Sequence, residues 1–291
     1  MNNLIYSLMV VAGAALYGTM SSFVKLAYEA GYNSAEVAFW QAFLSALVLS
    51  VLCLRNISRL TALSARDIFS LLVTGAMIGL TNLTYYTSVQ YISASLAVIL
   101  LMQFSWMSLL IESFLGRKSP RAEWYTVVVI LFGTLLASGF LESDLLKISM
   151  KGVFYACLSA LTYALYIVLN GRISQKSTWQ VKSAMIMIGS SICIFLFNAP
   201  QLASGGYLCA DFFFRALFLA IAGTAVPTVL FSIGIPRIGA VLSSVLMTVE
   251  LPVAVLTACI VLNESLTRLQ IVGVLILLAA VIGLNILRNS R

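Results

Sequence analysis

Long apolar stretches separated by short polar connectors run through the whole sequence. A helix that crosses a membrane needs about 20 consecutive, mostly apolar residues, and the chain contains ten stretches of this kind. The expected spans are 4–27, 35–54, 68–89, 93–115, 124–141, 152–170, 182–197, 213–233, 239–262 and 269–287. Because the connectors leave no room for a soluble domain, the pattern predicts an all-α integral membrane protein with ten transmembrane helices. The first stretch is too long for the apolar region of a signal peptide, and no Lys or Arg precedes it, so we expect a permanent helix.

Composition and charge agree with this class. Hydrophobic residues make up 61% of the chain and charged residues only 9%, against about 25% charged residues in a soluble domain. With the N-terminus in the cytoplasm, twelve of the 17 Lys and Arg residues fall on the cytoplasmic side, which is the positive-inside bias. The net charge of +7 therefore indicates orientation and not a nucleic-acid partner. We expect both termini in the cytoplasm of a multi-pass protein of the plasma (inner) membrane.

The two halves of the chain resemble each other. At an offset of 146 residues, "AALYG" falls on "ALTYA" and superposes Tyr17 on Tyr163, while "ISASLAVILL" falls on "IGAVLSSVLM". The repeats are 1–145 and 146–291, each with five expected spans. Because five is odd, the second repeat must enter the membrane from the opposite side. Inverted repeats of this kind recur in secondary transporters, with the substrate site near the middle of the membrane.

Three segments carry a resemblance to a known family: "YGTMSSFVK", "TYALYIVLNGR" and "ELPVAVLTACIVLNESLTRLQIVGVLILLAAVIG". Over essentially its full length the chain resembles the drug/metabolite transporter superfamily, specifically the EamA-type carriers of ten helices. The family often has Trp where Tyr17 stands, and a proline that is missing from "MQFSWMSLL". The resemblance implies a carrier of small organic metabolites, often an exporter of amino acids or related compounds, with a central cavity between its helices.

Glu250 is the candidate for the central chemistry. No other charged residue occurs from Ile238 to Leu262, and an acidic residue at the middle of a membrane helix costs about 2.5–3.5 kcal/mol. Pro252 lacks an N–H and frees a carbonyl one turn back, near Thr248, so the helix is expected to loosen there; Pro227 is the second expected helix break. Glu250 could couple transport to protons or bind an amine, and the structural alternative is a protonated acid bonded to a neighbouring helix.

Aromatic and amide side chains are expected to complete a substrate site, since ligand pockets combine aromatic walls with a few polar groups. At an offset of 147, Gln103 falls on Glu250 as a neutral counterpart. The alternative for each aromatic residue is helix packing or an interfacial belt. The candidate substrate-binding residues are Glu250, Gln103, Trp106, Tyr17, Asn82, Tyr85, Tyr86, Tyr163 and Tyr166.

Other classes of function fit less well. Histidine is absent, the five cysteines are scattered without a CxxC pair, and no second carboxylate accompanies Glu250 in mid-membrane, so we expect no enzyme, metal or cofactor.

With no ATP-binding motif, transport is expected to be passive or ion-coupled. The sequence favours an exporter exchanging protons at Glu250, with an uptake carrier or facilitator of an organic cation as the alternative. A channel or non-transporting sensor is a further alternative class. The expected partners are a small-molecule substrate, membrane lipid and protons; the oligomeric state is left open.

Overall fold

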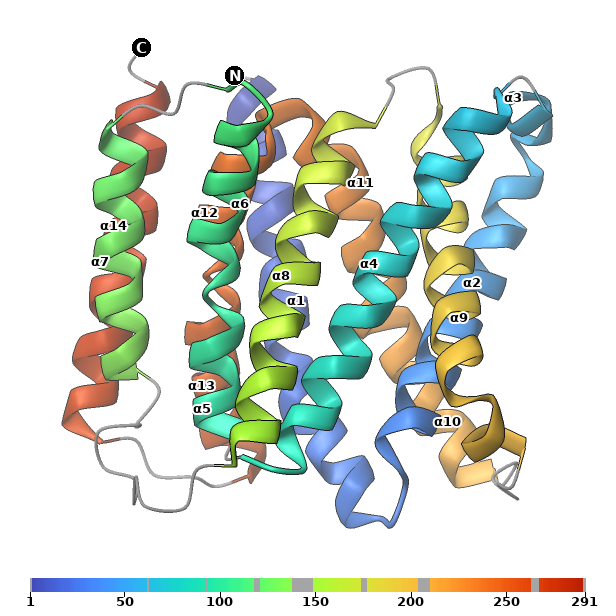
Figure 1. Ribbon diagram of the computed structural model, residues 1–291, viewed down its shortest axis with the longest axis horizontal. Helices are drawn as coiled ribbons and strands as arrows, with labels where there is room; N and C mark the ends of the chain where they lie inside the picture. The colour runs from blue at the N-terminus through green and yellow to red at the C-terminus, as the bar shows by residue number, and fades with distance from the viewer. Residues whose placement is uncertain are drawn as a thin grey trace.

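The computed structural model describes residues 2–61, 63–92, 94–117, 121–137, 149–173, 177–203, 210–262 and 267–289. These parts of the chain are helical, without strands (Figure 1). The elements are α1 (Asn2–Glu29), α2 (Ser34–Leu54), α3 (Ile57–Thr61), α4 (Ala65–Val89), α5 (Ala94–Leu101), α6 (Phe104–Phe114), α7 (Arg121–Ala137), α8 (Met150–Arg172), α9 (Trp179–Ala203), α10 (Ala210–Ala220), the π-helix η3 (Ile221–Ala225), α11 (Val226–Ile238), α12 (Ala240–Met247), α13 (Glu250–Leu262) and α14 (Arg268–Asn289).

The all-helical membrane architecture is confirmed in its main features. Eight helical stretches among the described residues are long and apolar enough to cross a membrane. Two of them, Leu96–Phe114 and Ala240–Val261, each combine two short helices that follow one another. α7 has only 17 residues, and the described apolar part of α14 is Arg268–Gly283, so the count of ten spans stays a prediction. Figure 1 shows both chain termini at the same end of the bundle.

Local sequence signals set several helix ends. Asn33 caps α2: its side chain accepts a hydrogen bond from the backbone N–H of Ala35 at 2.9 Å, and Glu36 accepts one from the backbone N–H of Asn33 at 3.2 Å. Ser64 and Asp67 form the same reciprocal capping box at the start of α4. Between α11 and α12, Gly239 has a φ of 85°, a conformation that glycine adopts without strain and that lets the chain reverse.

Helices of the two halves pack against each other in a repeated pattern. α1 packs on α11 and α13, while α4 packs on α8 and α9. The counterpart of α1 in the second half is α8, and the counterpart of α11 in the first half is α4. The contact between α1 and α11 therefore corresponds to the contact between α8 and α4. α2 pairs with α9 and α7 with α14, and each of these pairs maps onto itself. The two halves therefore contact each other through several pairs of helices.

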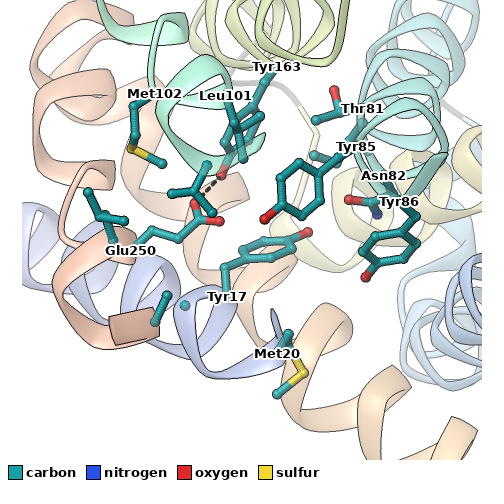
Figure 2. Close-up of a pocket in the computed structure, with 15 residues that line it drawn as sticks. Tyr17, Met20, Thr81, Asn82, Tyr85, Tyr86, Leu101, Met102, Tyr163 and Glu250 are labelled. Carbon is teal, nitrogen blue, oxygen red and sulfur yellow. Dashed lines mark hydrogen bonds between the residues drawn. The ribbon is translucent and has the colours of Figure 1, made fainter. Parts of the chain in front are cut away.

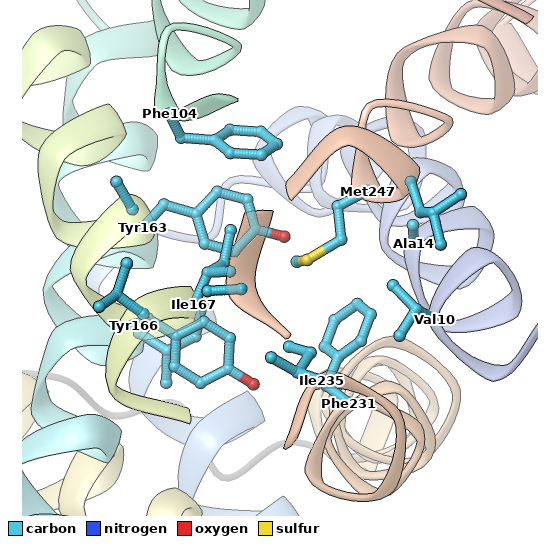
Figure 3. Packing of buried hydrophobic residues seen from close by; sticks show 14 of the residues in the cluster. Val10, Ala14, Phe104, Tyr163, Tyr166, Ile167, Phe231, Ile235 and Met247 are labelled. Atoms are coloured by element: carbon cyan, nitrogen blue, oxygen red, sulfur yellow. The ribbon is translucent and has the colours of Figure 1, made fainter. Parts of the chain in front are cut away.

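Glycines allow the closest of these contacts. A Cβ atom at Gly18 of α1 would collide with the carbonyl oxygen of Glu250, and one at Gly75 of α4 would collide with the backbone of Ile186 in α9. Small residues at such crossings are how membrane helices approach closely. Large side chains fill the space that remains in the middle of the bundle, where Phe104, Tyr163, Phe231 and Met247 gather in one buried cluster (Figure 3).

Candidate substrate site

An interruption between α12 and α13 places Glu250 at a helix start. The backbone N–H groups of Thr248 and Val249 donate to carbonyls three residues back, at 3.2 and 3.3 Å. Pro252 has no N–H to donate to the Thr248 carbonyl, which accepts instead from the N–H of Leu251 at 3.2 Å. The helix thus loosens near Thr248, and Glu250 is the first residue of α13 with Pro252 two positions later.

The first half has a matching interruption without a proline, between α5 and α6. The Gln103 backbone N–H donates to the Leu100 carbonyl at 3.2 Å. This leaves the Ile99 carbonyl without its usual helical donor, and the Gln103 side-chain amide donates to it at 3.0 Å. The amide oxygen of Gln103 accepts from the Trp106 indole N–H at 2.8 Å. Gln103 and Trp106 therefore stabilise a helix break, and neither lines the cavity described below.

The two interruptions lie 146 residues apart, whereas the expected match of Gln103 with Glu250 needs an offset of 147 residues. α5 and α12 begin and end 146 residues apart, as do the starts of α6 and α13. Phe104, and not Gln103, therefore corresponds to Glu250. Phe104 is fully buried and packs edge to face on Tyr163, with ring centroids 4.7 Å apart.

Pro227 follows a widened turn instead of ending a helix. α10, η3 and α11 form one continuous span from Ala210 to Ile238. In η3 the turn is enlarged by one residue, so the Val226 N–H donates to the carbonyl of Ile221, five positions back. Pro227 is the second residue of α11, directly after this turn, where a missing N–H is tolerated.

A small cavity of about 50 Å³ lies where the two halves meet (Figure 2). Its lining comes from α1, α4, α5, α8 and α13. Six of the expected site residues line it: Glu250, Tyr17, Asn82, Tyr85, Tyr86 and Tyr163. Tyr166 does not, because it lies fully buried behind Tyr163, with the two rings stacked at a centroid distance of 6.2 Å.

Sequence reasoning missed the other described lining residues, among them Met20 and Thr81. Thr81 lies four residues before Tyr85, on the same face of α4, and this spacing is a signal that could have revealed it. Its hydroxyl meets the Thr162 hydroxyl of α8 at 2.9 Å, which joins the two helices beside the cavity.

Glu250 is the one charged residue among the cavity's described lining. The Tyr163 hydroxyl donates a hydrogen bond to its Oε2 at 3.2 Å, shown as a dashed line in Figure 2. No other side-chain hydrogen bond to this carboxyl group occurs in the described chain. A partly buried carboxylate with one neutral partner keeps capacity for a proton or for a cationic ligand.

Donor groups collect in the rest of the cavity. The Tyr17 hydroxyl is buried and has no hydrogen-bond partner within the described residues. Tyr85 and Asn82 also line the cavity, and Figure 2 shows the Tyr85 hydroxyl directed toward its centre. Tyr86 differs, because its hydroxyl donates to the amide oxygen of Gln41 at 3.4 Å. The cavity thus offers one acidic end and several neutral donors.

A second, larger cavity of about 1010 Å³ opens toward the end of the bundle opposite the termini. It is lined by the ends of α1, α2 and α4 and by α8 and α9, with Tyr28, Gln90 and Tyr91 among its residues. Toward the end that carries the termini, Arg172 of α8 forms a two-pronged ion pair with Glu112 of α6, at 3.2 and 3.3 Å. The two halves are therefore joined by charge at one end and separated by a cavity at the other.

The sequence matches the model of the EamA-like transporter family twice, over residues 4–139 and again over 150–286. The chain belongs to the EamA-like transporter family. It is accordingly a multi-pass membrane protein of a family of transporters, which are not enzymes.

Individual relatives agree with the family assignment. This EamA-like transporter is 26% identical to an uncharacterised transporter of Archaeoglobus fulgidus over 94% of its own length and 93% of the relative's. It is 27% identical to the threonine/homoserine exporter RhtA of Escherichia coli K12, covering 76% of this chain and 73% of that one. A crystal structure with 12% sequence identity superposes with a TM-score of 0.74 over 95% of both chains, which shows a shared fold.

Proposed function

We propose that this EamA-like transporter is a secondary carrier that exports amino-acid-like or other amine-bearing solutes across the plasma membrane in exchange for protons. It works by alternating access, with the halves 1–145 and 146–291 acting as inverted repeats of five spans and both termini in the cytoplasm. The repeated packing pattern, in which α1 meets α11 and α13 as α8 meets α4 and α6, supports this organisation. Two similar halves can exchange conformations at little cost in free energy.

One observation carries the proposal: Glu250 faces the cavity between the halves as the single charged residue of its described lining, with one hydrogen bond from Tyr163. An unpaired carboxylate in the middle of a membrane is costly. A proton or a substrate ammonium group relieves that cost, and the two compete for the same oxygens. Binding of a proton therefore releases the amine, and release of the proton restores its site.

The neutral donors favour an amino-acid-like solute. Tyr17, Tyr85 and Asn82 can donate hydrogen bonds to a carboxylate while Glu250 accepts from the ammonium group at the other end. The relatives named as threonine/homoserine exporters agree with such a substrate. We call the small cavity at Glu250 the inner cavity and the larger cavity beside Tyr28 and Gln90 the outer cavity. The difference in their volumes supports a state that opens away from the termini.

Uptake or facilitated diffusion of an organic cation is the second candidate. It is favoured by the absence of Lys and Arg from the described cavity lining and by its four tyrosine rings, whose faces attract cations. In that case Glu250 stays charged and pairs with the ligand throughout the cycle.

A thermal-shift comparison separates these functions. Purified wild type, Glu250→Gln and the control Glu29→Gln, which changes an exposed carboxylate at the end of α1, are screened against amino acids, the matching decarboxylated amines and quaternary amines at two pH values. A ligand at 100 times its Kd stabilises a protein by about 2.7 kcal/mol.

We expect an amino acid to stabilise wild type and Glu29→Gln in a pH-dependent way, and Glu250→Gln to lose the pH dependence. Stabilisation by amines alone, lost in Glu250→Gln at every pH, would favour the organic-cation carrier. Equal, pH-independent binding by all three proteins would contradict both functions for Glu250.

A further inference from the structure

Two tyrosine rings stand between the inner and the outer cavity. Tyr86 of α4 lines the inner cavity, whereas Tyr28 of α1 lines the outer one. Their rings meet edge to face with centroids 6.5 Å apart. A displacement of Tyr86 would join the two cavities, so whatever fixes this ring controls the passage.

Gln41 of α2 fixes Tyr86. The Tyr86 hydroxyl donates to the Gln41 amide oxygen at 3.4 Å, and the Gln41 amide nitrogen donates to the Thr224 hydroxyl at 2.6 Å. Gln41 is only 2% exposed. A buried amide needs hydrogen-bond partners for both its oxygen and its nitrogen. Here the oxygen is bonded to Tyr86 of the same half, and the nitrogen is bonded to Thr224 of the opposite half.

Thr224 lies in η3, the π-helical turn before α11. Its hydroxyl donates to the Leu219 carbonyl, five positions back, at 3.4 Å, which follows the enlarged turn. π turns are rare and occur mostly at functional sites. Conversion of this turn to regular α-helix would change its register by one residue and rotate Thr224 away from α2.

We propose that Gln41 is the positioning residue of the outer gate, coupling the π turn at Thr224 to the Tyr86 ring. When the turn rearranges, the hydrogen bond from Gln41 to Thr224 breaks, Tyr86 loses its fixed partner, and the barrier between the cavities opens. The inference rests on the alternating-access function proposed above. It adds a residue outside the expected substrate site and assigns a role to the π turn.

The gate can be tested without a known substrate, by cysteine labelling. Ala254 lines the inner cavity, and Ala254→Cys is introduced after the five native cysteines are replaced by serine. A membrane-impermeant maleimide is added to the side of the outer cavity. Because Gln41→Leu removes both side-chain hydrogen bonds at similar size, we expect it to accelerate labelling about fivefold, as the loss of a net hydrogen bond allows.

Two other variants break the same chain of contacts. Thr224→Val and Tyr86→Phe each keep the shape of the side chain but remove one hydroxyl, and both should accelerate labelling. Gln41→Glu should label slowly, because the Thr224 hydroxyl can donate to its carboxyl group. The matched control is Ser45→Ala: Ser45 is buried and also joins α2 to α10, through the Ala220 carbonyl at 2.8 Å, and its side chain has no hydrogen bond to Tyr86.

Labelling at the wild-type rate in Gln41→Leu, Thr224→Val and Tyr86→Phe would overturn the proposal. So would a Ser45→Ala variant that accelerates labelling as much as they do, because general loosening of α2 would then explain the effect. If Gln41→Leu does not fold, the other two variants decide. Accelerated labelling in a protein that transports no amine would contradict the proposed function but would still support the role of Gln41 in the gate.

Discussion

At the scale of single residues, one hydrogen bond defines the chemistry of the site. Tyr163 donates to Glu250 at 3.2 Å, and both residues belong to the second half of the chain, in α8 and α13. The sequence predicted Glu250 from the cost of a charge in an apolar helix, and Tyr163 from its place in the repeat. It could not predict that Gln103 and Trp106 bond each other, because the carbonyl left free at Ile99 exists only once the helix is interrupted.

Replacing Tyr163 by Phe should weaken binding at Glu250. The change removes the hydroxyl and keeps the ring, so the carboxylate loses its donor while the packing on Phe104 is retained. A hydrogen bond to a charged group contributes about 1.5–3 kcal/mol, and we expect an affinity loss of about ten- to hundredfold in titration calorimetry with the best-stabilising ligand.

Tyr166→Phe is the matched control for this change. Its hydroxyl accepts from the Asn170 amide at 3.3 Å, and the side chain lies behind the cavity wall. Ligand affinity should change little in this variant. An equal loss in both variants would contradict a specific role for the hydrogen bond from Tyr163 to Glu250.

At the scale of helices, proline chemistry predicted part of the irregular structure. The loosening at Thr248 follows from the missing N–H of Pro252, and the structure has it there. The interruption between α5 and α6 contains no proline, so the local sequence did not predict it. Pro227 was expected to break a helix, and instead it follows the π turn η3. The contacts of Gln41 with η3 and of Ser45 with α10 join residues far apart in sequence, so no local pattern predicts them. The short helix α3 was not expected either, because five residues are too few for a periodic pattern.

The crossing of α4 and α9 gives a prediction at this scale. A methyl group at Gly75 would collide with the backbone of Ile186, which cannot move as a side chain can. Gly75→Ala should therefore destabilise the protein by about 1–3 kcal/mol, the usual cost of overpacking, seen as a lower Tm of the purified protein. Gly283→Ala in α14 adds a methyl group that meets nothing within 4 Å and should leave the Tm unchanged or slightly raised. Equal Tm values for the two variants would contradict the tight crossing.

At the scale of the whole molecule, the repeat is visible both in sequence and in packing. An offset near 146 residues appeared in the sequence, and the two interrupted helix pairs keep that offset. The sequence could not tell which end of the bundle is open, because a symmetric design stabilises both states. On the account proposed here, that choice depends on long-range contacts: Arg172 with Glu112 at the end that carries the termini, and Tyr28 with Tyr86 in the proposed gate.

The central claim is that Glu250 exchanges a proton for substrate between the two halves. The most direct measurement uses proteoliposomes that enclose a pH-sensitive dye and receive a gradient of threonine, or of whichever solute stabilises the protein best. We predict that the solute gradient drives protons in the opposite direction in wild type, and that Glu250→Gln abolishes this proton movement. Solute flux in wild type without proton movement, or proton movement that persists in Glu250→Gln, would contradict the account.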